Sequence, residues 1–363
     1  METLSSHQMA QYAVPTLSEL EVKSLEKAEE ADYQAFVEIS PTSNYCQDLA
    51  WKSVIESTYG KKPDYLVCRE RETGRITGVA PAFWMESLVF GRRLVSLPYL
   101  DYGGILAENP EAEDALVEAL LEDAHARKAK LDIRQESPLP NRQAPANRKV
   151  RMILDLREQT EDAYWKSLDA KVRNQVRKAQ KSEITVRTGR GELLREFYKV
   201  FCVNMRDLGS PVHDLALFRN VLLHFPGAEI VLAMWKNVCV GGLVRIHWKN
   251  TMVIPWASTL RKYRSYCPNN AIYWDSIATA FKRDCTTVDF GRSTQEEGTY
   301  RFKRQWLAEE SPLPWYSFDP SGRAPADIGQ PGGLMQAISG LWTKLPTWYA
   351  NRLGPPIRGA MSN

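Results

Sequence analysis

Long apolar runs are missing from this sequence. No stretch reaches the roughly 18 apolar residues that a membrane-crossing helix needs. Residues 1–16 carry no basic region followed by an apolar one, so we expect no secretory signal peptide and a loosely ordered N-terminus. These absences predict a cytoplasmic protein.

Residues suited to metal binding or covalent catalysis are also sparse. The six cysteines form no Cys-x-x-Cys pair, and the five histidines stand in unrelated contexts. We therefore expect single buried thiols in a reducing compartment, no metal site and no tightly bound cofactor. No Ser-His-Asp or Cys-His arrangement can be assembled, which disfavours a covalent enzyme intermediate.

The charge balance excludes a global basic field. Lysine and arginine number 47 against 44 acidic residues, a net charge of +3, so any site for an anion must be local. A hydrophobic content of 44% and a length of 363 residues fit a soluble chain with two domains, each with its own core.

The predicted elements follow the same loose order in both halves of the chain. Each half has helices, short strands joined by tight turns, a further helix and a further strand, and prolines from Pro138 to Pro145 mark the junction. We predict an α/β (α+β) fold with mixed, mainly antiparallel sheets flanked by helices. The expected parts are a flexible start (1–16), an N-terminal domain (17–145), a C-terminal domain with the main site (146–320), and a Pro/Gly-rich linker with an amphipathic segment (321–363).

The stretch from Val288 to Trp306 is the main candidate for a binding site. A β-branched run leads into Asp289 and Gly291, as when a buried strand ends in a tight turn. Phe302 and Trp306 are four residues apart and can share one helix face, which would hold Lys303 in place. A fixed lysine can bind phosphate or stabilise a developing negative charge.

Two other positions in this stretch are candidates. Arg292 and Tyr300 are expected to bind substrate. Asp289 is expected either to accept a proton from an attacking amine or to serve as a structural hydrogen-bond acceptor.

A local basic segment and a helix start are candidate phosphate contacts. Residues 171–190 hold seven Lys/Arg against one acid, although charged helix faces are often only solvated. Arg173 and Arg177 are four apart and could address one diphosphate, with Lys178 beside them. Asn269 and Asn270 follow a proline at a predicted helix start, where free backbone N–H groups favour an anion.

Three further residues have both a functional and a structural interpretation. Asp101 lies in a loop with two tyrosines and paired glycines, either a ligand-facing loop in which it could accept a proton from the attacking amine, or only a turn. Trp256 and Tyr273 could stack on a sugar or base, or could pack in the core. The aromatic segment 334–353 could lie on a membrane or a partner, or pack against its own domain.

Several ordered motifs resemble the FemAB-like branch of the GNAT acyltransferase superfamily. They are Asp-Phe-Gly-Arg-Ser-Thr (289–294), Gly-Thr-Tyr-Arg-Phe-Lys-Arg-Gln-Trp (298–306), Ile-Pro-Trp-Ala-Ser (254–258) and Cys-Pro-Asn-Asn (267–270). The sequence is most similar to the FemAB-related proteins associated with PEP-CTERM and exopolysaccharide systems, over most of its length.

The resemblance implies two tandem GNAT-like domains and direct transfer of an acyl or aminoacyl group to an amine on a cell-envelope or exopolysaccharide precursor. It implies that Phe302 and Lys303 match a Phe-Lys pair that the family uses. It also implies that the basic helix contacts acceptor phosphates or a donor tRNA, and that Asp101 lies at the substrate cleft.

The donor expected from the resemblance is aminoacyl-tRNA or acyl-CoA. The Gln/Arg-x-x-Gly-x-Gly/Ala loop usual in coenzyme A enzymes is absent, which favours the aminoacyl donor. The alternatives are an acyl-CoA-dependent N-acetyltransferase and a non-catalytic module that binds a phosphorylated glycan. Expected partners are the phosphorylated acceptor, tRNA, and the inner face of the membrane through the C-terminal segment.

Overall fold

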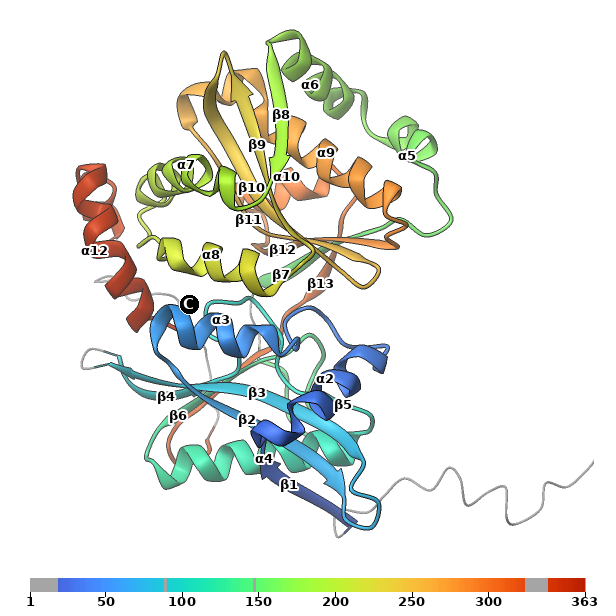
Figure 1. Ribbon diagram of the computed structural model, residues 1–363, viewed down its shortest axis with the longest axis vertical. Helices are drawn as coiled ribbons and strands as arrows, with labels where there is room; N and C mark the ends of the chain where they lie inside the picture. Colours follow the sequence, from blue (N-terminus) through green and yellow to red (C-terminus); the bar gives the residue numbers. More distant parts are fainter. Residues whose placement is uncertain (1–18, 88–89, 146–147, 324–338, 363) are drawn as a thin grey trace, which may run out of the picture. The chain divides into compact units, whose positions relative to one another are not determined.

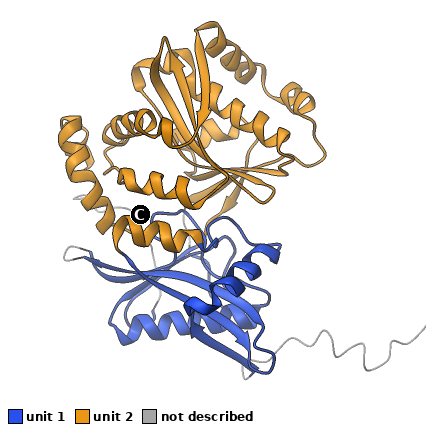
Figure 2. Ribbon diagram, viewed as in Figure 1, with its two compact units in different colours: residues 1–49, 61–145, 315–326 blue, residues 50–60, 146–314, 327–363 orange. Residues whose placement is uncertain are grey.

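The computed structural model describes residues 19–87, 90–145, 148–323 and 339–362. The chain divides into two compact units, coloured in Figure 2. Unit 1 comprises residues 1–49, 61–145 and 315–326, and unit 2 comprises residues 50–60, 146–314 and 327–363. Each unit has one mainly antiparallel sheet with helices against it, so the predicted mixed α/β fold is confirmed (Figure 1). The expected flexible start at 1–16 lies outside the described residues.

The sheet of unit 1 has the strand order β1-β2-β3-β4-β6-β14, and β5 pairs with β3. Only β4 and β6 run parallel. The strands are β1 (Leu20–Ser24), β2 (Lys62–Glu70), β3 (Ile76–Ser87), β4 (Gly91–Val95), β5 (Leu106–Ala107), β6 (Lys130–Arg134) and β14 (Trp315–Phe318). The helices are η3 (Lys27–Glu29), α2 (Glu30–Ile39) and α4 (Pro110–Ala126).

Helix α4 supplies much of the core of unit 1. The Asn109 side chain accepts a hydrogen bond from the Ala112 amide and Pro110 opens the first turn, which together fix the helix start. Leu116 and Leu120 are fully buried among the apolar side chains of the sheet. Helix α4 and the strands that it covers therefore share one core cluster.

The sheet of unit 2 has the strand order β13-β7-β12-β11-β10-β9-β8. Only β11 and β12 run parallel. The strands are β7 (Lys149–Asp155), β8 (Ile184–Gly189), β9 (Ala228–Trp235), β10 (Val238–Trp248), β11 (Thr251–Thr259), β12 (Thr287–Thr294) and β13 (Glu309–Pro312). Lys236 and Asn237, with φ of 46° and 65°, form the tight turn expected between β9 and β10.

The helices of unit 2 pack on its sheet or on other helices. They are α3 (Ala50–Tyr59), α5 (Glu161–Ser167), α6 (Ala170–Lys181), η4 (Gly191–Leu193), α7 (Leu194–Asp207), α8 (Leu215–His224), η5 (Arg261–Tyr266), α9 (Pro268–Lys282), α10 (Gly298–Arg304) and α12 (Thr347–Ala360). Side chains of α5, α6 and α9 share one core cluster with strand residues such as Met152 and Phe290.

Two segments differ from the expected arrangement. Helix α3 was expected with the first half of the chain, but it packs on α8 and belongs to unit 2. Strand β14 was expected within the C-terminal domain (146–320), but it pairs with β6 in unit 1, whereas the preceding strand β13 pairs with β7 in unit 2. Sequence patterns give the elements, but only long-range pairing assigns them to a sheet.

Residues 160–181 have an apolar face at helical spacing that predicts one long helix, but they form two helices, α5 and α6. Leu168 leaves the helical conformation with ψ of 145°, and the Asp169 side chain accepts a hydrogen bond from the Lys171 amide. Asp169 thus caps a new helix start. Because the apolar face continues on both sides of Asp169, the spacing of apolar residues does not reveal this break.

Candidate functional site

The strands β11 and β12 separate partway along their length. They are paired only from Thr251 with Thr287 to Val253 with Asp289. Beyond that point β12 stays paired with β7 and β11 stays paired with β10. The sheet therefore opens between two neighbouring parallel strands at the motif that the sequence singled out.

A bulge in β12 accompanies this opening. The register with β7 shifts between Asp289 and Arg292, and Gly291 has a φ of 68°, a left-handed conformation that glycine adopts without strain. The Asp289 carboxylate is fully buried and accepts hydrogen bonds from the Gly291 amide at 2.7 Å and from Arg151 Nε at 2.8 Å. Both carboxylate oxygens thus hold the bulge, in agreement with the structural interpretation of Asp289.

Lys303 binds the other side of the same bulge. Its side chain is buried, and Nζ donates to the Arg292 carbonyl at 2.7 Å and to the Gly291 carbonyl at 3.2 Å. The neighbouring Phe302 and Trp306 rings contact each other at 6.3 Å between centroids, as their spacing predicted. The ammonium group is therefore held in a fixed place at the point where the sheet opens.

Two buried polar atoms near the bulge have no hydrogen-bond partner among the described residues. They are the hydroxyl of Ser293, which follows Arg292 on β12, and the indole Nε1 of Trp306. Most buried polar groups in folded proteins are paired, so unpaired ones often mark a place that a ligand or water completes. Sequence analysis did not select Ser293, because a serine in a strand carries no signal until its neighbours are known.

Tyr300 lies on α10 with the guanidinium of Arg304 over its ring at 5.9 Å. Its hydrogen bond to Glu310 raises the pKa of Tyr300 above the usual value. The Tyr300 hydroxyl is therefore protonated at neutral pH and can donate its hydrogen bond to Glu310. Arg292, also a candidate for substrate binding, is half-buried and contributes its carbonyl to Lys303.

The start of α9 is fixed by the side chains of the two candidate asparagines. Asn269 Oδ1 accepts from the Thr259 hydroxyl at the end of β11, and Asn270 Nδ2 donates to Gln175 Oε1 on α6 at 3.2 Å. Both amides thus position the helix start, which follows Cys267 in a left-handed conformation (φ 57°).

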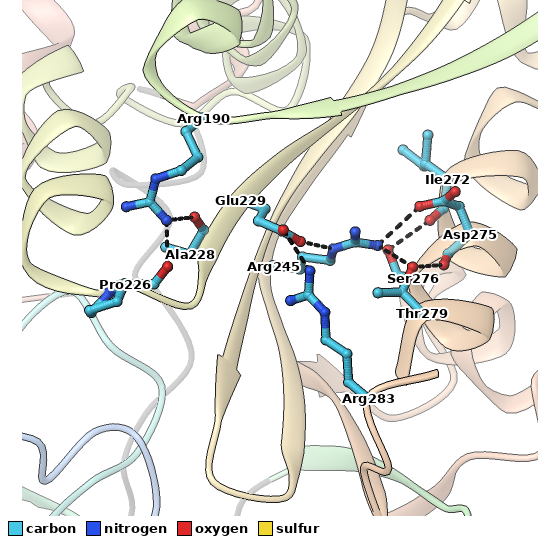
Figure 3. Close-up of polar contacts among 10 residues, drawn as sticks. All are labelled: Arg190, Pro226, Ala228, Glu229, Arg245, Ile272, Asp275, Ser276, Thr279 and Arg283. Atoms are coloured by element: carbon cyan, nitrogen blue, oxygen red, sulfur yellow. Dashed lines mark hydrogen bonds and ion pairs between the residues drawn. The ribbon is translucent and has the colours of Figure 1, made fainter. Parts of the chain in front are cut away.

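A network of charged residues holds α9 to the sheet (Figure 3). The buried Arg245 of β10 donates to Glu229 at 2.8 Å and to Asp275 at 3.0 Å, and Arg283 donates to Glu229 at 2.6 Å. Burial by itself would raise the pKa of Glu229, but these two arginines lower it below its usual value. The network is internally neutralised and fixes the orientation of α9.

The basic residues of α6 differ in what they contact. Arg173 donates to the carbonyls of Lys166 at 2.6 Å and Leu168 at 2.7 Å, and so closes the end of α5. Arg177 is exposed, with its guanidinium 5.7 Å from the Trp165 ring, and Lys178 is exposed as well. Of the three candidates, Arg177 and Lys178 therefore carry exposed charge, as do Lys171 and Lys181 on the same helix.

The two candidate aromatic residues pack in different places. Trp256 lies against Phe218 of α8 at 5.2 Å and Trp51 of α3 at 6.5 Å. Tyr273 lies against Phe302 at 4.8 Å, and burial raises its pKa above the usual value. Both rings thus have the packing contacts of the structural interpretation, and Tyr273 supports Phe302 directly.

Asp101 belongs to unit 1, in a loop that is tightly held. Its carbonyl accepts from Trp315 Nε1 at 2.9 Å, and Arg134 Nη1 donates to the Leu100 carbonyl at 2.5 Å. Tyr99 is buried with a φ of 72°. The backbone of this loop is therefore fixed from the sheet side by Arg134 and Trp315.

The part of the chain that the structure describes includes no group of three or more His, Cys, Asp or Glu side chains that could hold a metal ion. Within the same residues, no helix is both long enough and apolar enough to span a bilayer.

Residues 166–304 match the family model described as an acetyltransferase (GNAT) domain. This range takes in α6, the separating strands β11 and β12, α9 and α10. No curated protein sequence matches the chain.

Solved structures resemble the chain across both units. FemX is 16% identical with a TM-score of 0.62, over 88% of this chain and 100% of that one. The C-terminal domain of a putative lysylphosphatidylglycerol synthetase from Agrobacterium fabrum is 10% identical with a TM-score of 0.55, over 88% and 96%. A tandem GNAT protein from the clavulanic acid biosynthesis pathway is 11% identical with a TM-score of 0.52, over 83% and 99%. In fold, the chain is therefore a protein of two tandem GNAT-like units.

Proposed function

We propose that this protein is an acyltransferase that moves an acyl or aminoacyl group to an amine on a phosphate-bearing precursor of the cell envelope or of an exopolysaccharide. The observation that carries the proposal is the buried Lys303 ammonium, fixed on the bulge of β12 where β11 and β12 separate. The match of residues 166–304 to an acetyltransferase domain supports the same reaction class.

The chemistry requires a fixed positive charge near the reacting carbonyl. The acceptor amine attacks the carbonyl carbon of an ester or thioester, a C–N bond forms, and negative charge develops on the carbonyl oxygen. The C–O or C–S bond then breaks, the leaving oxygen or sulfur takes a proton, and the amine loses one. Lys303 would stabilise the oxyanion.

The donor is the finer part of the proposal. The family model describes acetyl transfer, which favours acyl-CoA. The name lysylphosphatidylglycerol synthetase, given to one similar structure, describes a lysyl group joined to a phosphate-bearing acceptor, which favours an aminoacyl donor. The exposed Arg177 and Lys178 supply positive charge for a phosphorylated acceptor or for the tRNA of such a donor.

The donor class can be determined by thermal unfolding of the full chain with acetyl-CoA and with aminoacyl-tRNA. A donor at a hundred times its Kd stabilises the folded protein by about 2.7 kcal/mol, which raises Tm by a few degrees. A shift with acetyl-CoA alone identifies a coenzyme A enzyme, and a shift with charged tRNA alone identifies an aminoacyltransferase. No shift with either donor would contradict the proposal and favour a binding module.

Transfer to an amine acceptor should then be followed with Lys303→Met. We expect at least a hundredfold loss of turnover, the order of loss found when one stabilising group for an oxyanion is removed. Arg304→Met, at the neighbouring exposed position, is the matched control and should retain activity. A folded Lys303→Met variant with full activity would remove Lys303 from the mechanism.

A further inference from the structure

The C-terminal segment of residues 339–362 is fixed to unit 2 at several points along its length. A Cβ atom at Gly209 would lie 2.2 Å from the Ser339 hydroxyl, and Arg206 Nη1 donates to the Thr347 hydroxyl at 2.9 Å. Gly354 packs closely on Val212, where a Cβ atom would lie 2.8 Å from a methyl group. The segment is therefore an ordered part of the unit, as one sequence interpretation expected.

The outer side of this docked segment exposes large apolar side chains. Trp348 is 70% exposed, Leu341 66% and Tyr349 41%, and Leu208, next to Gly209, is 55% exposed. The Trp348 and Tyr349 rings contact each other at 5.4 Å between centroids. Leu208 and Leu341 lie one and two residues from the close approach of Gly209 to Ser339. Exposed apolar side chains near one another mark an interaction site more often than scattered ones do. We call these four side chains the outer apolar face.

The docked segment carries basic and no acidic side chains. Residues 339–362 contain Lys344, Arg352 and Arg358 and no aspartate or glutamate. Lys344 and Arg352 are exposed, and Arg352 lies one helical turn after Trp348, whereas Arg358 donates to His213. The acid beside Arg206 on α7, Asp207, is paired with Arg206 at 2.7 Å. The segment thus joins exposed aromatic and aliphatic side chains to the positive charges of Lys344 and Arg352.

We propose that the outer apolar face binds a membrane surface whose lipids carry negative charge. Trp and Tyr side chains are favoured at the boundary between headgroups and acyl chains, and lysine and arginine beside them attract anionic headgroups. A second copy of the chain is a poorer occupant, because a two-fold contact would set positive charge against positive charge. The inference goes beyond the proposed transfer reaction and does not depend on it.

The test is co-sedimentation of the full chain with vesicles of phosphatidylcholine alone and of phosphatidylcholine mixed with phosphatidylglycerol. We expect binding to the mixed vesicles and much weaker binding to phosphatidylcholine, with the difference reduced by salt. Lys344→Gln and Arg352→Gln should each weaken binding to the mixed vesicles about fivefold, since one basic side chain near an anionic surface contributes roughly that factor.

The apolar contribution is tested with Trp348→Ser and Leu341→Ser. Each is expected to weaken binding to the mixed vesicles about tenfold, because the variant no longer gains the free energy of moving one large apolar side chain out of water. Because both side chains are exposed, Tm should stay unchanged. Leu223→Ser is the matched control, since Leu223 is 71% exposed on α8, outside the outer apolar face.

Three results would overturn the inference. The first is no sedimentation with either kind of vesicle. The second is equal binding by the Trp348→Ser variant and the Leu223→Ser control. The third is a concentration-dependent dimer that Trp348→Ser abolishes, which would identify a second copy of this chain as the occupant.

Discussion

The most consequential residues at the candidate site act on backbone geometry. Asp289 and Lys303 bind opposite parts of one bulge, and Asp289 is in turn paired with Arg151 on the neighbouring strand. A carboxylate that is fully buried is costly unless it is paired and hydrogen-bonded, and here it is both. Loss of one partner should therefore cost more than the pair itself contributes.

We expect Arg151→Ala to lower the free energy of unfolding of unit 2 by about 3 kcal/mol, because it leaves the Asp289 charge buried without its arginine. Chemical denaturation, with hydrogen exchange in β7 and β12 as the readout, would measure this loss of unfolding free energy. The control is Arg157→Ala, at an exposed pair with Asp155 at 2.5 Å, where we expect a change of about 0.5 kcal/mol. Equal effects at the two arginines would show that the bulge does not depend on this pair.

His213 should make unit 2 sensitive to acid. It is buried, contacts Tyr59 at 2.8 Å and accepts from Arg358 Nε at 3.2 Å. Burial, followed by the Arg358 charge, holds the pKa of His213 well below the usual 6.5. Below pH 6.5 the His213 side chain is protonated in the unfolded chain but stays neutral in the folded chain. The contribution of neutral His213 to stability is therefore complete above pH 6.5 and is lost as the pH falls from there toward the folded pKa.

The slope is expected to approach about 1.4 kcal/mol per pH unit below the unfolded pKa. Urea unfolding of the wild type and His213→Gln at several pH values isolates this contribution, which the variant should lack. His125→Gln, which removes an exposed histidine of unit 1, is the control and should keep the wild-type dependence. Parallel pH profiles for all three proteins would contradict the assignment.

At the scale of elements, single arginines close helix ends that the sequence leaves open. Arg190, in the turn after β8, donates to the Pro226 and Ala228 carbonyls before and at the start of β9 (Figure 3). It also donates to the Leu222 carbonyl near the end of α8. Its distances to the Pro226 and Ala228 carbonyls are 2.5 Å and 2.6 Å. The planar guanidinium can serve several acceptors together, which a lysine ammonium serves less well.

Arg190→Ala is expected to destabilise unit 2 by about 2 kcal/mol, since charged hydrogen bonds to buried carbonyls are lost. Arg190→Lys should recover only part of that loss. Unfolding in guanidinium chloride gives both free-energy changes. Arg187→Ala, at an exposed position of β8, is the control and should change the free energy of unfolding little. Full recovery by lysine would mean that charge alone matters at this helix end.

At the scale of the whole molecule, the chain leaves unit 1 and returns to it. The return strand β14 lies at the edge of the sheet of unit 1, and its Tyr316 hydroxyl accepts from the Leu139 amide at 3.0 Å. Three residues earlier, the Leu313 amide donates to the Lys149 carbonyl of unit 2 at 3.2 Å. Neighbours in sequence thus stabilise different units.

Two substitutions separate these contributions. Tyr316→Ala should lower hydrogen-exchange protection in β6, and Leu313→Ala should lower it in β7, each by about 3 kcal/mol because a buried side chain is removed. Each variant is the control for the other. Loss of protection in both units from either substitution would show that they unfold as one cooperative body.

Much of the architecture followed from the sequence alone. Strand and helix periodicities, the turn at Lys236 and Asn237, and the contact between Phe302 and Trp306 depend on neighbours a few residues apart, so local patterns predict them. The stretch around Asp289 and Gly291 could also be selected as a candidate, because an acid and a glycine at the end of a buried strand are unusual residues in that position. Which partner each residue finds was not evident.

Only the tertiary structure decided the partners that lie far apart in sequence. Arg151 meets Asp289 across 138 positions, and the Ser293 hydroxyl is left without a partner among the described residues. The sequence determined local conformation and which faces are apolar, because these depend on backbone sterics and on spacing. Strand order and the pairing of buried charges depend on how the whole chain closes on itself, and no local pattern contains that information.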